Sequence, residues 1–265
     1  MARISFISLH FLVVYDTCQF DVERIWVNVI NVEVFVEVGV SALGLHLRAV
    51  IFDLDGTLIN SAIPFKEMKR KVIAHLQANG VTSGLLNEDM LNTEIVKLAI
   101  GDLRQKGFSE NQITKVLVQV SKIMNEVELQ SLSSATLIEG VPRTLQALKL
   151  QGLKLGVLTR GCREYTQRIL AKFGLQEFFD AVAARDDVSQ PKPDPEHAFY
   201  LLRLLGVKAQ ETLFVGDHLL DAECASQAGL RFVFVGSGQG IVKVLELGYQ
   251  AVDNVNDIIK IIKSD

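Results

Sequence analysis

Two aspartates in the segment Asp53-Leu54-Asp55-Gly56-Thr57 are the residues best placed to do chemistry together. Residues two apart in extended backbone project the same way, so Asp53 and Asp55 are expected to face one site. Gly56 permits the tight turn that follows them. Asp and Gly are also common as plain turn residues at the end of a strand, and the segment alone leaves that alternative open. As a chemical site, the segment predicts two converging carboxylates.

A second acidic motif, GDHLLD, occupies residues 216–221 and also follows an apolar run. On its own it has an ordinary structural explanation, with Asp217 as a helix N-cap and Asp221 as an acid in the first helical turn. If both motifs end parallel strands, their four carboxylates meet in one crevice, where mutual repulsion would raise each pKa unless a cation neutralised them. A site made only of oxygen ligands favours Mg²⁺, which keeps several waters and can share the phosphate oxygens of a substrate. Mg²⁺ is therefore the predicted cofactor.

Thr159 and Lys192 are weaker candidates that stand between the two acidic motifs in the sequence. The hydroxyl of Thr159 and the backbone N–H groups after it, including that of Gly161, would suit a phosphoryl oxygen. An ordinary helix cap is the alternative for Thr159. Lys192 lies between Pro191 and Pro193, which restrict the backbone and would hold the ammonium group toward an anion. A solvated loop lysine is the alternative there.

Apolar runs and helical patterns alternate along most of the chain, and they predict the elements that position these motifs. Residues 48–52 form a short run typical of a strand buried on both faces. Residues 64–140 have apolar positions at helical spacing, with Ser109 and Gln112 as a capping box. Further strands are expected at 153–158, 181–184, 212–215 and 231–235, with helices ending at 151, 173, 205 and 228. This order predicts a doubly wound, mainly parallel α/β sheet that binds ligands beyond the carboxyl ends of its strands.

The same pattern divides the chain into three predicted regions. Residues 48–60 and 140–265 form the α/β core, and residues 61–139 form a helical cap inserted directly after the first strand. Residues 1–47 form an atypical extension with a valine-rich segment at 25–40. Apolar residues in that segment change from odd to even positions, so a bulge or turn is required near residues 28–31.

Composition excludes several classes of protein. The chain has 265 residues, 49% of them hydrophobic and 22% charged, which excludes wholesale disorder. Its 27 basic and 31 acidic residues give a net charge of −4, which argues against nucleic acid or an anionic membrane as a partner. The uncharged run at residues 4–15 is shorter than the ~20 residues of a membrane helix. Three cysteines without a Cys/His cluster favour a reduced, cytoplasmic protein.

The order of the motifs resembles a known family, the haloacid dehalogenase superfamily. Four motifs are similar: Asp53-x-Asp55-x-Thr57, Thr159, Lys192 and Gly216-Asp217-x-x-x-Asp221. The resemblance covers residues 48 to about 250. The Pro-Lys-Pro-x-Pro run and the segment ending at Gly229 are similar to those of phosphoglycolate-phosphatase-like members, which carry a small helical cap after the first motif. The resemblance implies a Mg²⁺-dependent phosphatase that acts on a small phosphorylated metabolite.

The resemblance also implies a role for each matching residue. Asp53 would attack phosphorus, and Asp55 would act as general acid and then as base. Thr159 and Lys192 would steady the phosphoryl group. Groups from both acidic motifs would hold the metal: Asp53, the backbone carbonyl of Asp55, Asp217 and, through water or neighbouring groups, Asp221. The acid at Asp55 argues against a dehalogenase, because dehalogenases of this superfamily lack it.

Other residues are candidates for contact with the substrate: Thr57, Arg160 and Gly161. Arg160 stands where relatives often have Asn or Asp, and it either binds a second anionic group on the substrate or lies in solvent at a helix start. In the cap, three basic residues are candidates either for substrate selection or for a solvated helix face: Lys66, Lys69 and Arg70.

Two alternative functions remain open from the sequence. A phosphomutase of the β-phosphoglucomutase type uses the same core residues but returns the phosphoryl group to a sugar. A non-catalytic binding or regulatory module would keep the fold and use residues 1–47 to dock a partner, although such a module has no need for Asp55. The sequence does not decide between a monomer and a homodimer.

Overall fold

The computed structural model describes residues 24–29, 32–37, 47–236 and 239–264. The chain divides into two compact units, one of residues 1–44 with Asp265 and one of residues 45–264. In the first unit, strands β1 (Arg24–Val29) and β2 (Val32–Glu37) pair antiparallel, with Val29 opposite Val32. This pairing fits the predicted turn near residues 28–31, of which residues 30 and 31 lie outside the described residues.

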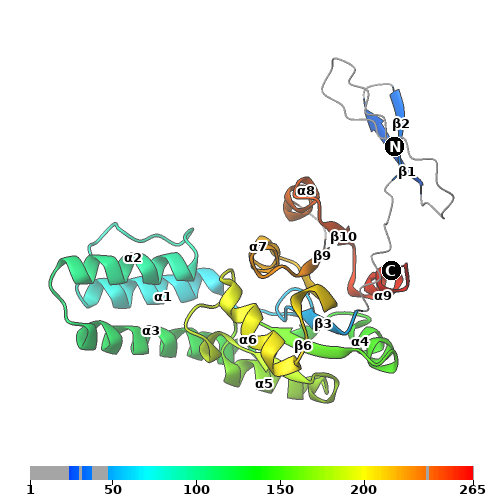
Figure 1. Ribbon diagram of the computed structural model, residues 1–265. Coiled ribbons are helices and arrows are strands. Elements are labelled where there is room, and N and C mark those ends of the chain that lie inside the picture. The colour runs from blue at the N-terminus through cyan, green and yellow to red at the C-terminus, as the bar shows by residue number, and fades with distance from the viewer. Residues whose placement is uncertain (1–23, 30–31, 38–46, 237–238, 265) are drawn as a thin grey trace. The chain divides into compact units, whose positions relative to one another are not determined.

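The second unit is built on a six-stranded sheet in which every neighbouring pair of strands is parallel (Figure 1). In sheet order, the strands are β10 (Gln250–Val252), β9 (Arg231–Val235), β8 (Thr212–Gly216), β3 (Ala49–Phe52), β6 (Lys154–Leu158) and β7 (Ala181–Ala183). All of them except β10, which is not among the predicted strands, lie within one residue of the predicted bounds. The predicted doubly wound, mainly parallel α/β fold is therefore confirmed.

Helices cover both faces of this sheet, because the side chains of each strand alternate between the faces. In β3, Ala49 and Ile51 pack into one hydrophobic cluster, and Val50 and Phe52 pack into another. The first cluster includes residues of α6 (Pro195–Leu205), α7 (Leu219–Ala228) and α8 (Gln239–Glu246). The second includes residues of α4 (Val141–Leu150), α5 (Arg163–Lys172) and α9 (Ile258–Ser264). The strands are thus buried on both sides, as their continuous apolar runs predict.

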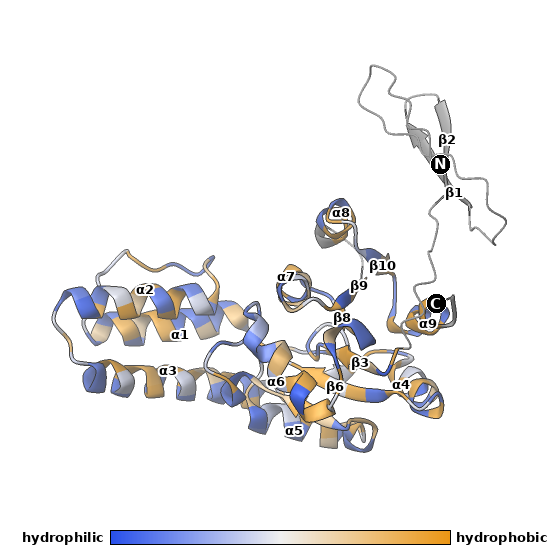
Figure 2. Cartoon of the chain, in the orientation of Figure 1, coloured by the Kyte–Doolittle hydropathy of each residue, from blue (hydrophilic) through white to orange (hydrophobic). Residues whose placement is uncertain are grey.

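Three helices occupy the insertion between β3 and α4: α1 (Phe65–Ala78), α2 (Asn92–Gln105) and α3 (Glu110–Ser131). α3 begins with the predicted capping box, in which the backbone N–H of Ser109 donates to Oε1 of Gln112 at 2.9 Å. α2 is not among the individually predicted helices, although its buried residues Ile95, Ala99 and Leu103 follow helical spacing. Figure 2 shows hydrophobic and hydrophilic residues alternating along all three helices, as expected for helices with one buried face.

The two segments that connect this helical insertion to the sheet pair with each other. β4 (Ile59–Asn60) and β5 (Thr136–Leu137) form a short antiparallel ribbon. Short 3₁₀ helices complete the described elements: η1 (Gln176–Phe178), η2 (Arg185–Asp187), η3 (Ala209–Glu211) and η4 (Val255–Asp257). The division of the chain into core, cap and extension stays a prediction. Within the described residues, no helix has the length and apolar character needed to cross a membrane.

Candidate active site

The first acidic motif forms a tight turn at the carboxyl end of β3. The backbone N–H of Asp53 donates to the carbonyl oxygen of Val215 at 2.9 Å, which continues the pairing of β3 with β8. The turn then closes through a 2.7 Å bond from the N–H of Gly56 to the carbonyl oxygen of Ile59. Gly56 has a φ of +97°, and a Cβ at this position would lie 2.1 Å from Oδ2 of Asp217. Glycine is therefore required both by the backbone conformation and by the close approach of the second motif.

The second acidic motif begins at the carboxyl end of the adjacent strand, β8. A Cβ on Gly216 would lie 2.5 Å from Oδ2 of Asp221, so the absence of a side chain lets the first turn of α7 approach the strand end. The N-cap of α7 is His218, whose Nδ1 accepts from the N–H of Leu220 at 3.1 Å. Asp217 is therefore not the helix cap that its sequence position also allowed, and its carboxylate turns to the site.

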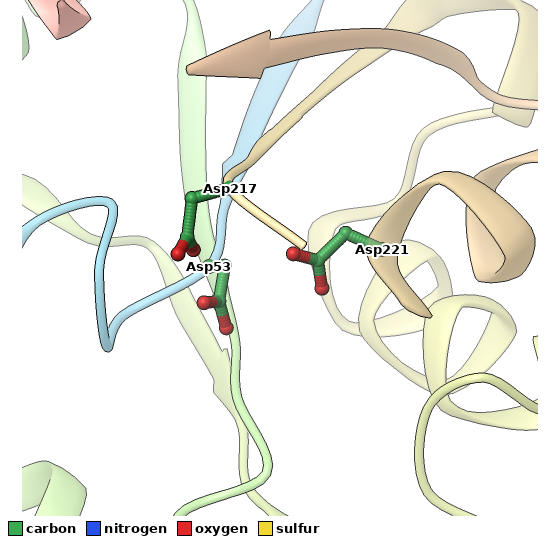
Figure 3. Close-up of side chains that lie close together, drawn as sticks. All are labelled: Asp53, Asp217 and Asp221. Atoms are coloured by element: carbon green, nitrogen blue, oxygen red, sulfur yellow. The ribbon is translucent and has the colours of Figure 1, made fainter. Parts of the chain in front are cut away.

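Three carboxylates meet where these two motifs lie side by side. Asp53, Asp217 and Asp221 each offer an oxygen atom, and the three oxygens lie within 4.8 Å of one another. Figure 3 shows the side chains turned toward one another from the end of β3, the end of β8 and the start of α7. Asp55 lines the same surface cavity as these three residues. Its carboxylate lies outside the group of three and accepts a 2.7 Å hydrogen bond from the hydroxyl of Tyr165. The acidic site thus consists of a cluster of three carboxylates and a fourth that is held separately.

Lys192 lies inside this cluster. Its Nζ donates to Oδ1 of Asp53 at 2.6 Å and to Oδ1 of Asp221 at 2.7 Å, and the residue is only 1% exposed. The alternative of a solvated loop lysine is therefore wrong. The backbone N–H of Lys192 donates to Nδ1 of the buried His197, whose Nε2 donates to the carbonyl oxygen of Ala184 at 3.0 Å. The buried His197 thus holds the loop that carries Lys192 in position.

The electrostatics of the cluster favour a further positive charge. Burial raises the pKa of Asp53 well above its usual range, and Asp221 and Asp217 add to this more weakly, while Lys192 opposes it. Burial, followed by the charge of Asp221, also raises the pKa of Asp217. Burial tends to lower the pKa of Lys192, but Asp221 and Asp53 outweigh it and raise the pKa overall. One ammonium group therefore faces three carboxylates, and a cation among them would relieve the repulsion.

The three oxygens suit a hard divalent cation. Such ions prefer oxygen ligands, and Mg²⁺ holds them at about 2.0–2.1 Å, so that oxygens on one ion lie roughly 3–4 Å apart. Lys192 occupies Oδ1 of Asp53 and of Asp221, and the backbone N–H of His218 donates to Oδ2 of Asp221 at 3.1 Å. Asp221 is thus already bonded at both oxygens, whereas Oδ2 of Asp53 remains available. This donor set fits direct ligation of the ion by Asp53 and Asp217. Asp221 would add negative charge near the ion without bonding to it directly.

Two residues predicted at the substrate are instead committed to protein contacts. The hydroxyl of Thr57 is buried and donates to Oδ1 of Asp217 at 3.0 Å, so Thr57 orients a carboxylate rather than facing the substrate. The N–H of Gly161 donates to Oγ1 of Thr159 at 3.0 Å and is not free for a phosphoryl oxygen. Thr159 directly follows β6, and the N-cap of the next helix is Cys162. Thr159 is therefore not a helix cap, and its hydroxyl hydrogen is left to donate.

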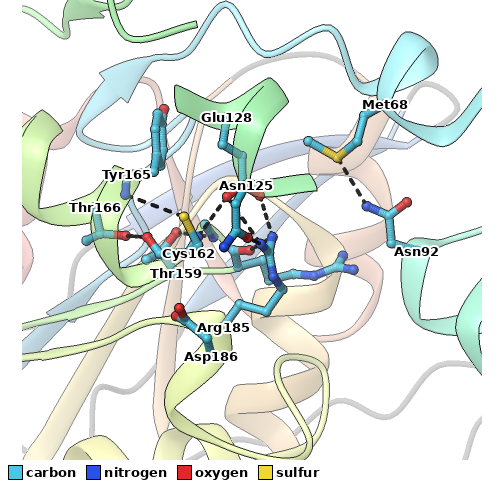
Figure 4. Close-up of polar contacts among 12 residues, drawn as sticks. Met68, Asn92, Asn125, Glu128, Thr159, Cys162, Tyr165, Thr166, Arg185 and Asp186 are labelled. Atoms are coloured by element: carbon cyan, nitrogen blue, oxygen red, sulfur yellow. Dashed lines mark hydrogen bonds and ion pairs between the residues drawn. The ribbon is translucent and has the colours of Figure 1, made fainter. Parts of the chain in front are cut away.

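A buried ion pair that involves the helical insertion, and that the sequence reasoning missed, contacts the loop after Thr159. Glu128 on α3 is 3% exposed, and its Oε2 accepts from the N–H of Cys162 at 2.9 Å. Arg185 on η2 pairs with Glu128 and donates to Oδ1 of Asn125 at 2.6 Å (Figure 4). Glu128 continues the buried helical repeat of α3 one turn after Met124. A charged residue on that buried face was the available signal, because charged side chains are rarely buried without a partner.

A large cavity of about 1840 Å³ joins these groups to the helical insertion. Its core lining includes Asp53, Asp55, Lys192, Asp217 and Asp221. Of the three basic cap candidates, Lys69 lines the cavity and donates to the carbonyl oxygen of Glu88, whereas Arg70 pairs with the Glu88 carboxylate and Lys66 is exposed. Neither Lys66 nor Arg70 is part of the lining. Of the three basic residues, Lys69 therefore stays a candidate for substrate selection.

Family membership follows from the sequence around this site. The sequence model of the haloacid dehalogenase-like hydrolases matches residues 50–235, a range that includes both acidic motifs, Thr159 and Lys192. The chain belongs to this family. This hydrolase therefore has the fold and the motif order that the resemblance predicted.

Relatives with curated names are similar along most of the hydrolase. Pyrophosphatase PpaX of Halalkalibacterium halodurans is 31% identical over 192 residues, which cover 72% of this chain and 85% of the relative. Pyrophosphatase PpaX of Bacillus mycoides is 30% identical over 223 residues, which cover 82% of this chain and 98% of the relative.

Solved structures share the fold of the hydrolase. A predicted phosphoglycolate phosphatase from Haemophilus somnus 129PT has a TM-score of 0.55 and 25% identity, covering 81% of this chain and 97% of that chain. A predicted phosphatase from Clostridium acetobutylicum has a TM-score of 0.59 and 21% identity, covering 83% and 100%. The second similarity concerns the fold alone.

Proposed function

We propose that this hydrolase is a Mg²⁺-dependent phosphatase that hydrolyses a small phosphate monoester through an aspartyl-phosphate on Asp53. The observation that carries the proposal is the contact of Lys192 with Asp53 inside a cluster of three carboxylates, of which Asp53 and Asp221 are buried and Asp217 is partly buried. The pyrophosphatase names of the relatives support a phosphoryl group as the part of the substrate that reacts.

Asp53 is the proposed nucleophile. One oxygen of the Asp53 carboxylate attacks phosphorus and displaces the alcohol oxygen of the ester, while the bond from Lys192 to Oδ1 holds the carboxylate in place. Lys192 and the hydroxyl of Thr159 then hold the oxygens of the transferred group. Three groups would hold Mg²⁺: the carboxylates of Asp53 and Asp217 and the backbone carbonyl of Asp55. The charge of the ion would neutralise negative charge on the phosphoryl oxygens.

Asp55 is the proposed general acid and base. Burial, followed by the charge of Asp53, raises the pKa of Asp55 to about 7, so that the carboxyl group holds a proton in part of the molecules near neutral pH. In the first step that proton goes to the departing alcohol oxygen as the bond from phosphorus to that oxygen breaks. In the second step Asp55 takes a proton from water while the water oxygen bonds to phosphorus and the bond to Asp53 breaks. The products are the alcohol and inorganic phosphate.

The buried cysteines support the proposed location in the cytoplasm. Cys162 and Cys224 are both free thiols, as cysteines of a reducing compartment are expected to be. Burial raises the pKa of each thiol to about 12, so neither is primed as a nucleophile that would compete with Asp53.

The proposal is tested by phosphate release from a panel of phosphate esters, with Mg²⁺ and with excess EDTA. We expect turnover that requires the metal and disappears in Asp53→Asn, because an amide is a poor nucleophile toward phosphorus. Undiminished turnover in EDTA or in Asp53→Asn would contradict the proposal. Sugar 1-phosphates in the same panel distinguish a phosphatase, which releases phosphate, from a phosphomutase, which forms the 6-phosphate.

A further inference from the structure

Arg160 is a cation of the active-site cavity that lacks a bonded counter-charge. The residue lines the cavity and is partly buried. Among the residues that the structure describes, its guanidinium group has no hydrogen bond or ion pair. A guanidinium group carries five N–H donors in a planar fork that matches the oxygens of a carboxylate or phosphate. A partly buried guanidinium without a partner is therefore unusual and calls for a ligand.

Two other cations of the cavity, the buried Lys192 and the partly buried Arg185, are already bonded. Lys192 is bonded to Asp53 and Asp221, and Arg185 is bonded to Glu128. Lys97 also lines the cavity, but its side chain is exposed, so water satisfies it. Arg160 thus differs from Lys192 and Arg185 in having no partner, and from Lys97 in being partly withdrawn from water.

The backbone around Arg160 is held in place although its side chain is free. The carbonyl oxygen of Arg160 accepts from Nη1 of Arg185 at 2.9 Å. The next two N–H groups are also bonded, that of Gly161 to Thr159 and that of Cys162 to Glu128. The loop that carries the guanidinium is therefore fixed before a ligand arrives, which lowers the ordering cost of binding.

Charged groups of the carboxylate cluster and of the helical insertion both act on Arg160. Burial lowers the pKa of its guanidinium, Arg185 lowers it further, and three carboxylates oppose this: Asp221, Asp53 and Glu128. Asp53 and Asp221 belong to the carboxylate cluster, whereas Glu128 lies on α3 and is already paired with Arg185.

We propose that Arg160 forms a subsite for a second anionic group on the leaving side of the substrate, either a carboxylate or a second phosphate. Asp53 and Lys192 line the part of the cavity where the transferred phosphoryl group is proposed to bind, so a group bound by Arg160 would belong to the rest of the substrate. The inference rests on the proposed phosphatase function and names its substrate class, a phosphate ester or anhydride with a further negative charge.

Matched substrates test this subsite with and without the second charge. 2-Phosphoglycolate is compared with ethyl phosphate, which has a methyl group in place of the carboxylate. Inorganic pyrophosphate is compared with phenyl phosphate, and this second pair separates a phosphate ligand from a carboxylate ligand. The variants are Arg160→Met, which keeps an unbranched, flexible side chain without the charge, and Arg160→Lys, which keeps the charge. Lys97→Met removes an exposed cation of the cavity lining and is the matched control.

We expect Arg160→Met to lower kcat/KM for at least one doubly anionic substrate by about 10- to 100-fold, the range for a lost hydrogen bond between charged groups. The kcat/KM for its matched partner should change less than about threefold, Arg160→Lys should retain part of the preference, and Lys97→Met should resemble the wild type. An equal loss on both members of each pair would overturn the inference, because Arg160 would then serve the transferred phosphoryl group. No loss on any substrate would overturn it as well. Both of these results can be obtained only if the wild type releases phosphate. If the wild type releases none, the proposed function is contradicted instead.

Discussion

The hydroxyl of Tyr165 donates a hydrogen bond of 2.7 Å to Oδ1 of Asp55. Tyr165 lies on α5 and is fully buried, whereas Asp55 lies in the turn after β3, 110 residues earlier in the sequence. Asp55 drives the pKa of the Tyr165 hydroxyl further upward than burial alone, so the hydroxyl stays protonated and remains a donor. The bond holds Oδ1 of Asp55 in place, and Ser61 also donates to this carboxylate. Both contacts orient the group that is proposed to exchange a proton with the substrate.

Tyr165→Phe should therefore weaken general acid catalysis more than binding. We expect kcat/KM for ethyl phosphate to fall by about 10-fold, the worth of one hydrogen bond to a charged group. The kcat/KM for p-nitrophenyl phosphate should fall less, because p-nitrophenolate leaves with little help from a proton. Tyr200→Phe on α6 is the control. Equal losses on both esters would contradict the assigned role of Asp55.

Gly56→Ala tests the contact between the two acidic motifs. Gly174→Ala is the matched control, because Gly174 also has a positive φ, +65°, but nothing lies within 4 Å of the position that a Cβ would occupy there. Gly174→Ala should lower the free energy of unfolding by about 1–2 kcal/mol without affecting activity. Gly56→Ala adds a clash with Asp217, so its loss of stability should be larger, and activity should require at least about 10-fold more Mg²⁺. Urea unfolding and Mg²⁺ titrations measure both effects, and equal behaviour of the two variants would show that the contact has no consequence.

His197 makes the stability of the fold sensitive to acid. Burial, followed by the charge of Lys192, lowers the pKa of His197 to about 3, whereas the unfolded side chain titrates near 6.5. Between these values the unfolded state takes up a proton that the folded state refuses, so stability falls as pH decreases below 6.5. The stability lost by His197→Gln, measured by urea unfolding, should therefore shrink by up to about 1.4 kcal/mol per pH unit from pH 6 to pH 4. A constant difference across that range would mean that His197 is not held neutral.

Deletion of residues 1–44 should leave phosphatase activity and the melting temperature unchanged. These residues belong to a separate compact unit, and every proposed active-site residue lies at position 53 or later. Leu47 packs against the core of the second unit and is kept in the shortened chain. Thermal unfolding and kcat/KM of the shortened protein give the result directly. A chain that fails to fold would show that the extension supports the core.

The elements of the core could be predicted because buried parallel strands leave continuous apolar runs that end at polar motifs. Asp53 and Asp217 follow such runs directly, so their meeting at adjacent strand ends follows from the topology. β10 is short and partly exposed, and its three residues leave no comparable run in the sequence. The same holds for α2, whose apolar repeat is interrupted by charged residues on its exposed face.

The hydrogen-bond partners of individual side chains could not be predicted, because they depend on distances between segments far apart in the chain. The hydroxyl of Thr57 turns to Asp217, 160 residues away, and not to the cavity. Glu128 is a polar residue within an amphipathic helix until the loop at Cys162 and the side chain of Arg185 surround it. Sequence patterns identify which residue types arrive at the site, whereas the folded backbone decides which of them face one another.

The central claim, a covalent phosphoryl group on Asp53, is tested most directly by mass spectrometry of enzyme quenched in acid during turnover. The peptide that contains Asp53 should carry one added phosphoryl group in the wild type, and this group should be absent in Asp53→Asn. Asp55→Asn should retain phosphate binding but form and lose the group more slowly, because both steps need its proton transfer. Rapid turnover with no phosphoryl group on the protein, or with the group on another residue, would contradict the account.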